Sequence, residues 1–150
     1  MAWLAALIDG EGSVMLNTRW DASQRKGTLL MRPTVSVSNT DLRLLQACVD
    51  RTGIDRIYGH KRKAPSTNKA GFTWRMNVTD IRLWGPELEP HLICKREQMR
   101  LLLDALALKA VAANPSTRVA DHQAQLLTIQ TRIQQLNSRG RASGHQVGHQ

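Results

Sequence analysis

Two acids, Asp9 and Glu11, stand at the end of the most apolar segment of the chain, the stretch "AWLAALIDGEGSV". Gly10 and Gly12 alternate with them and end the apolar helical run that precedes them. Acids near the C-terminus of a helix oppose the helix dipole, so their presence needs a reason. Carboxylate oxygens are also the ligands that hard divalent cations prefer. The stretch is therefore either a polar, glycine-rich turn that terminates a helix or a group of acids with a chemical role.

The composition points to a polyanionic partner. The chain has 150 residues, a formal net charge of +9 and an isoelectric point near 10.6. Such a basic balance favours nucleic acid as the partner, although a merely solvated surface is the alternative that composition leaves open. The length predicts one domain, over residues 1–137, followed by a disordered basic and polar tail over 138–150.

The cysteines and the hydropathy restrict the class of protein further. Cys48 and Cys94 are far apart and form no CxxC motif, so neither a zinc cluster nor a disulfide framework is indicated. No segment reaches the length that a bilayer requires. We expect a soluble intracellular protein with no membrane partner and no small-molecule cofactor.

The first half of the chain alternates between helix and strand patterns. Residues 2–10 are apolar or small throughout, which predicts a helix buried on more than one side. Apolar and polar side chains then alternate over 13–20 and 31–38, which indicates an antiparallel hairpin. Residues 38–53 predict a capped helix stopped by Gly53, and a second hairpin follows from Ile57 to Val78 around a basic turn.

The second half is helical. A short helical piece is expected near Asp80 to Trp84, interrupted by Pro86 and Pro90. A long helix over about 96–113 and an amphipathic last helix capped near Ser116 complete the chain.

This order predicts an α+β fold, αββαββα, in which one four-stranded antiparallel sheet is covered by helices on one face. The other face would be polar, basic and open, as a strand-based reader of the DNA major groove requires. The alternative is the ordinary solvated face that antiparallel sheets often have. The candidate DNA-binding residues on this face are Asn17, Arg19, Arg32, Thr34, Ser36, Tyr58, His60, Arg62, Arg75 and Asn77.

The stretch "LAALIDGEG" resembles the LAGLIDADG motif of the homing endonucleases, and the αββαββα order is similar to the fold of that family. The resemblance covers roughly residues 2–110. It implies a site-specific endonuclease that hydrolyses phosphodiester bonds of double-stranded DNA, encoded by a mobile genetic element active in intron homing.

A single copy of the motif is present, and family members with one motif act as homodimers on long, nearly palindromic targets. Ala6 and Gly10 are one helical turn apart, and their small side chains would let two such helices approach closely. The resemblance implies a dimer interface formed by Leu4, Ala6, Leu7, Asp9 and Gly10.

The resemblance also implies the catalytic groups. Glu11 matches the family's metal ligand, and the Gly10 carbonyl would assist it in binding Mg²⁺ or another divalent cation such as Mn²⁺. Asp9 matches the acid that more often holds the helix end in place. Lys95 and Asn39 match, by position, a basic residue beside the active site and a polar residue that orients solvent. A solvated lysine and a helix cap are the plainer interpretations of these two.

Two departures from the family pattern and two other functions stay open. Ala6 stands where the family usually has glycine, and almost nothing precedes the motif helix. The alternative function is DNA or RNA binding without cleavage, as a maturase or a regulator of the same fold. A general RNA-binding protein is disfavoured because Tyr58 is the only good stacking candidate on the predicted polar face.

Overall fold

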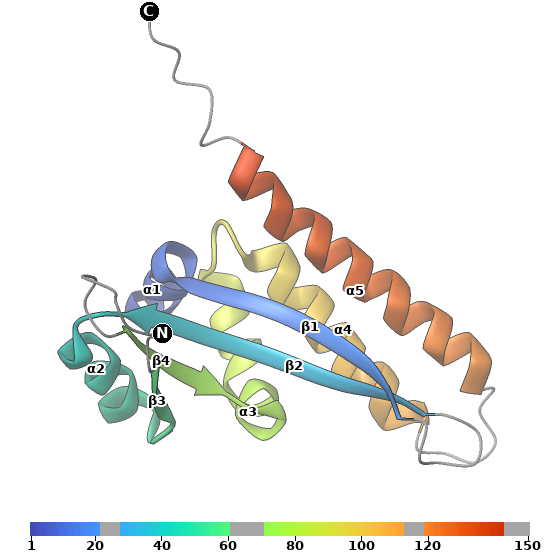
Figure 1. The fold of residues 1–150 in the computed structure, drawn as a ribbon, viewed down its shortest axis with the longest axis horizontal. Helices are drawn as coiled ribbons and strands as arrows, with labels where there is room; N and C mark the ends of the chain where they lie inside the picture. The colour runs from blue at the N-terminus through green and yellow to red at the C-terminus, as the bar shows by residue number, and fades with distance from the viewer. Residues whose placement is uncertain (22–27, 61–70, 113–118, 143–150) are drawn as a thin grey trace, which may run out of the picture.

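The computed structural model describes residues 1–21, 28–60, 71–112 and 119–142. The predicted element order is confirmed (Figure 1). The first half contains α1 (Ala2–Glu11), β1 (Gly12–Asp21), β2 (Thr28–Asn39), α2 (Leu42–Thr52), β3 (Ile57–His60) and β4 (Gly71–Met76). The second half contains α3 (Val78–Leu88), the 3-10 helix η1 (Glu89–His91), α4 (Arg96–Ala112) and α5 (Val119–Ala142).

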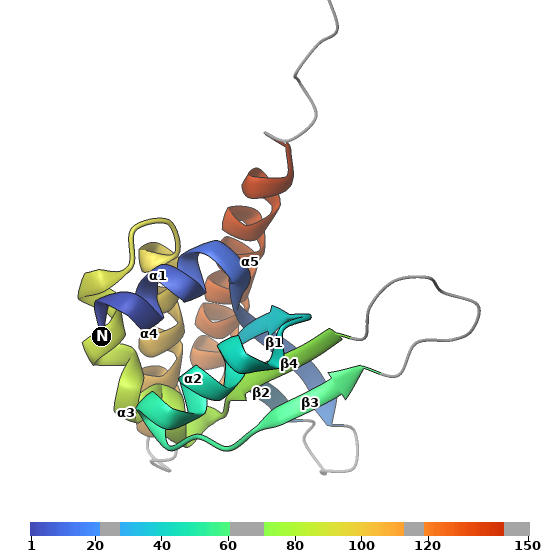
Figure 2. The same ribbon diagram turned by 90° about the vertical axis from the view of Figure 1, so that its left-hand side faces the viewer.

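The four strands form one antiparallel sheet in the order β1-β2-β4-β3. Val14 pairs with Val35, and Val37 pairs with Trp74, so the apolar positions of neighbouring strands lie on the same face. The described helices gather on one side of the sheet (Figure 2). The alternate, polar positions of the strands lie on the opposite face. The predicted arrangement of helices on one face is therefore confirmed.

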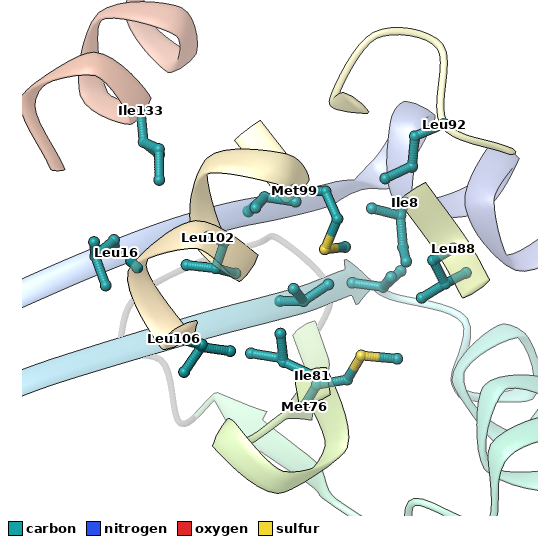
Figure 3. Close-up of a cluster of buried hydrophobic side chains, with 14 of the residues drawn as sticks. Ile8, Leu16, Met76, Ile81, Leu88, Leu92, Met99, Leu102, Leu106 and Ile133 are labelled. Atoms are coloured by element: carbon teal, nitrogen blue, oxygen red, sulfur yellow. The ribbon is translucent and has the colours of Figure 1, made fainter. Parts of the chain in front are cut away.

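The core lies between this apolar face and the helices. Leu16, Met76, Ile81, Leu102 and Ile133 come from five different elements and meet in one cluster (Figure 3). Burial of such side chains is the main term that holds the sheet to its helical layer. Trp74 is also fully buried, and its indole Nε1 donates a 2.9 Å hydrogen bond to the Ile54 carbonyl, which satisfies its polar atom.

Helix α5 covers the exposed edge of β1. Thr18 Oγ1 donates to Gln130 Oε1 at 2.7 Å, and Asn137 Nδ2 donates to the Val14 carbonyl at 3.1 Å. The second bond engages one main-chain carbonyl of β1, the edge strand of the sheet. The helix continues to Ala142, past residue 137 where we expected the domain to end. No helix among the described residues is long and apolar enough to cross a membrane.

Local signals account for both ends of α2 but not for the path of α3 through its proline. Asp41 caps α2 by accepting from the Arg43 amide at 3.0 Å, and Gly53 ends α2 in a left-handed conformation with φ 71°. The predicted interruption at Pro86 is wrong, because α3 runs through it. Ile81 and Leu88 are both fully buried on either side of the proline, and this packing keeps the segment helical.

Candidate functional site

The end of α1 is tied to the segment that precedes α4. The Asp9 carboxylate accepts a hydrogen bond from the Ile93 amide at 2.7 Å and from the Lys95 amide at 2.8 Å. In return, the Lys95 Nζ donates to the Asp9 main-chain carbonyl. A cation at this point complements the negative end of the helix dipole. Asp9 thus holds the helix end through its own chain, as the motif led us to expect of it.

Gly12 makes the abrupt change from α1 to β1 possible. A Cβ atom there would lie 2.7 Å from both the Cα and the carbonyl oxygen of Ile8. The Gly12 amide donates to that same carbonyl and closes the helix. Because the chain turns here without an intervening loop, Glu11 is left at an exposed corner between the helix and the sheet.

Glu11 borders a hollow of about 420 Å³ at this corner. Asn39, from the end of β2, and His60, from the end of β3, line the same hollow. The structure therefore brings together two of the three predicted catalytic residues, Glu11 and Asn39. Lys95 does not line the hollow, and its ammonium group is bonded at the end of α1 instead.

Asn39 is already engaged by its own chain. Its Oδ1 accepts from the Asp41 amide at 2.8 Å, which orders the turn into α2. The side chain that caps α2 is Asp41, so the plainer interpretation of Asn39 as the helix cap is wrong. We predicted His60 as a DNA-binding residue and not as a neighbour of Glu11. Only strand pairing, Asn39 with Phe72 and His60 with Gly71, places it there.

Most of the predicted DNA-binding side chains are exposed on the open sheet face. Ser36 is a correction, because it is only 7% exposed and its hydroxyl bonds that of Ser13 at 3.1 Å. Asn77 is another, because it follows β4 and forms a capping box with Asp80 at the start of α3. Thr34 is half-buried, and Arg62 lies outside the described residues. The exposed members are Asn17, Arg19, Arg32, Tyr58, His60 and Arg75.

The same face carries a short chain of bonded side chains. Ser38 Oγ and Thr73 Oγ1 are 2.7 Å apart, and Thr73 Oγ1 is 2.6 Å from His60 Nε2. The guanidinium of Arg75 lies over the ring of Tyr58, with Cζ 5.4 Å from the ring centroid. The face therefore presents ordered side chains from three strands.

The outer side of α1 is partly uncovered. Ala6 and Gly10 are exposed, and a Cβ added at Gly10 would meet nothing within 4 Å. Leu7 is half-buried beside them. The placement of Leu4 in a dimer interface is wrong, because this side chain is 2% exposed and belongs to the core of its own chain. The surface available to a second helix therefore combines two small residues with the partly exposed Leu7.

The donor atoms at the end of α1 suit a hard divalent cation. The Glu11 carboxylate is exposed, and the Gly10 carbonyl belongs to the last turn of the helix, where carbonyls lack a partner within the helix. Among the described residues, no three His, Cys, Asp or Glu side chains gather closely enough to hold a metal ion. Glu11 is the acidic residue that lines the hollow at this corner.

Three solved structures share this arrangement of elements. The homing endonuclease I-CvuI, in complex with the I-CreI target, is 19% identical with a TM-score of 0.66, over 90% of this chain and 80% of that chain. The archaeal intron-encoded homing endonuclease I-Vdi141I, complexed with DNA, is 14% identical with a TM-score of 0.67, over 89% and 81%. The LAGLIDADG homing endonuclease I-GzeII, in complex with a DNA target, is 17% identical with a TM-score of 0.67, over 86% and 43%.

The chain has the LAGLIDADG homing-endonuclease fold. In I-GzeII the matched part is less than half of the other chain, whereas I-CvuI and I-Vdi141I are matched over most of their length. No family model and no curated protein matches this chain. At these identities the similarity establishes the LAGLIDADG fold, and Glu11 stands where the motif helix of that fold ends.

Proposed function

We propose that this protein is a metal-dependent, site-specific endonuclease that acts as a homodimer on a long, nearly palindromic site in double-stranded DNA. One observation carries the proposal: the exposed Glu11 lies at the corner where the uncovered side of α1 meets the open face of the sheet. The neighbours of the same fold include endonucleases complexed with DNA.

The dimer would form through the outer sides of two α1 helices. Ala6 and Gly10 leave room for a second backbone, and Leu7 supplies apolar contact. Two helices that end side by side bring two Glu11 carboxylates close to the twofold axis. Two carboxylates held side by side repel each other, and bound cations relieve that repulsion.

Glu11 and the Gly10 carbonyl would hold Mg²⁺ or Mn²⁺, with oxygen ligands of the DNA and of the second copy completing the site. When bound, the metal would lower the pKa of a water molecule and stabilise the leaving oxygen. Asn39 lines the hollow beside Glu11, where its amide nitrogen can orient solvent. Lys95 neutralises the helix end that carries Glu11.

The DNA would lie against the open sheet face. A dimer carries twice the formal charge of +9, so binding should weaken steeply as salt rises. Arg19, Arg32 and Arg75 are exposed there and can meet base edges or phosphates in the major groove.

The test uses a pool of supercoiled plasmids with randomised inserts, incubated with the protein with and without Mg²⁺. We expect a subset of plasmids to be linearised only with Mg²⁺, and Glu11→Gln to abolish cutting while retaining binding to the selected inserts. Glu87→Gln, at an exposed position on α3, is the matched control and should cut normally. Normal cutting by Glu11→Gln would show that the metal site is elsewhere.

A second function, nucleic-acid binding without cleavage, is favoured by a different observation. The Asn39 oxygen and the Lys95 ammonium are both engaged by their own chain, so two predicted catalytic groups already have structural partners. This function predicts sequence-selective binding by the wild type with no Mg²⁺-dependent cutting in the same plasmid experiment.

A further inference from the structure

We propose that Arg75 reads a guanine in each half of the target and that Tyr58 is the support that orients it. The inference rests on the proposed binding of DNA by the open sheet face. Arg75 is on β4 and Tyr58 on the neighbouring strand β3, with the guanidinium carbon 5.4 Å from the ring centroid. Tyr58 is 49% exposed and Arg75 is also exposed, so both side chains are accessible on the open face.

The register partners of Arg75 and Tyr58 have short side chains that are hydrogen-bonded to other residues of the sheet. Ser36, the register partner of Arg75, bonds Ser13 and is buried. Thr73, the register partner of Tyr58, is also buried and bonds both Ser38 and His60. The hydroxyl groups of Ser36 and Thr73 are therefore buried, whereas the Arg75 side chain is exposed to solvent.

The guanidinium of Arg75 keeps its donors available. The Arg75 main-chain amide donates to the carbonyl of Arg56, the residue before β3, at 3.1 Å. With the other described residues, its side chain forms no hydrogen bond or ion pair, and its guanidinium lies over the Tyr58 ring. A cation–π contact with the ring uses none of the guanidinium N–H groups as conventional hydrogen-bond donors, so they stay available to a ligand.

A guanidinium group held in one orientation can donate two hydrogen bonds to a pair of neighbouring acceptors. Guanine presents O6 and N7 together in the major groove, and a bidentate arginine is the most common specific contact to it. The phosphate backbone offers acceptors as well, but it lies at the rim of the groove. Because β4 is an inner strand of the sheet, between β2 and β3, Arg75 is placed toward the base edges. Support by Tyr58 reduces the side-chain entropy lost on binding.

The experiment is a binding selection from duplexes with randomised half-sites, without divalent metal, for the wild type and five variants. We expect the wild type to prefer guanine at one position of each half-site by about 5- to 150-fold, the range for one bidentate arginine–guanine pair. Arg75→Ala should lose the preference at that position alone, and Arg75→Gln should shift it toward adenine. Tyr58→Phe should retain the preference, whereas Tyr58→Leu should reduce it.

Arg100→Ala, at an exposed position on α4, is the matched control and should leave every preference unchanged. Equal thermal unfolding midpoints of Arg75→Ala and the wild type would show that the variant is folded. If Arg75→Ala keeps all preferences and weakens binding to every duplex alike, the guanidinium contacts phosphate and the inference is overturned. If the wild type enriches no sequence, sequence-specific DNA binding itself fails, and the inference fails with it.

Discussion

Asp9 and Lys95 hold each other through both main chain and side chain. The Asp9 carboxylate accepts from the Lys95 amide at 2.8 Å, and the Lys95 ammonium donates to the Asp9 carbonyl. The second carboxylate oxygen accepts from the Ile93 amide at 2.7 Å. This reciprocal pair fastens the C-terminal end of α1, and with it Glu11, to the start of α4.

The substitution Asp9→Asn should destabilise the protein, because an amide group must replace one of two accepting oxygens and faces a main-chain N–H. We expect the free energy of unfolding to fall by about 0.5–1.5 kcal/mol, the net contribution of one hydrogen bond that is not fully buried. Urea unfolding followed by circular dichroism measures this. Asp55→Asn, at an exposed position, is the matched control and should change stability by no more than about 0.5 kcal/mol. Equal effects of the two substitutions would contradict the structural role of Asp9.

Gly12→Ala should also destabilise the fold. The added methyl group would lie 2.7 Å from the backbone of Ile8, so either the end of α1 or the start of β1 must move. We expect a loss of about 1–3 kcal/mol, measured by thermal or urea unfolding. At Gly59 an added Cβ meets only the ring of Phe72, at 3.7 Å and 3.8 Å, so Gly59→Ala should be tolerated. A Gly12→Ala variant as stable as the wild type would show that the turn can relax.

Ala6→Glu should abolish the proposed dimer while leaving the monomer folded. Ala6 is exposed on α1, so the longer acid fits the single chain, but it would bury a charge between two α1 helices. An unpaired buried charge costs about 3–5 kcal/mol, which weakens association at least about 100-fold. Sedimentation velocity measures the oligomeric state. Ala107→Glu, at an exposed position on α4, should remain dimeric, and an Ala6→Glu dimer of wild-type affinity would place the interface elsewhere.

The two cysteines should differ in reactivity. Burial raises the pKa of the Cys48 thiol from 9.0 to about 11, and its Sγ donates to the Leu44 carbonyl, whereas Cys94 is exposed. Because the thiolate is the reactive form, iodoacetamide at pH 8 should modify Cys94 quickly and Cys48 only after unfolding. Mass spectrometry of the wild type and of Cys94→Ser checks this, and fast labelling of folded Cys94→Ser would refute it.

The raised pKa of Cys48 also predicts a dependence of stability on pH. Below pH 9 the thiol is protonated in both the folded and the unfolded chain, so its contribution to stability is complete. Between pH 9 and about 11 the unfolded chain releases the proton first, so this contribution declines as pH rises. The free energy of unfolding should therefore fall more steeply over this range in the wild type than in Cys48→Ala.

Local sequence patterns were sufficient to predict the order of helices and strands and several residues of the candidate site. Alternation identified the inward positions Val14 and Val35, and Gly53 marked the end of α2, because each signal acts within a few residues. The motif located Glu11 at a helix end. The path of α3 through Pro86 was missed because buried contacts on both sides of the proline outweigh its local preference.

By itself, the sequence determined the αββαββα order, the apolar and polar faces of the sheet, and the acid at the end of the first helix. These three features can be predicted from the sequence because they depend on the types and spacing of residues that are close together in the chain. Only the tertiary structure decided that Leu4 and Ser36 are buried and that Asp9 engages a segment near residue 95. It also decided that Glu11, Asn39 and His60 share one hollow. Depth of burial and bonds between distant segments depend on which elements pack together, and no short stretch of sequence contains that information.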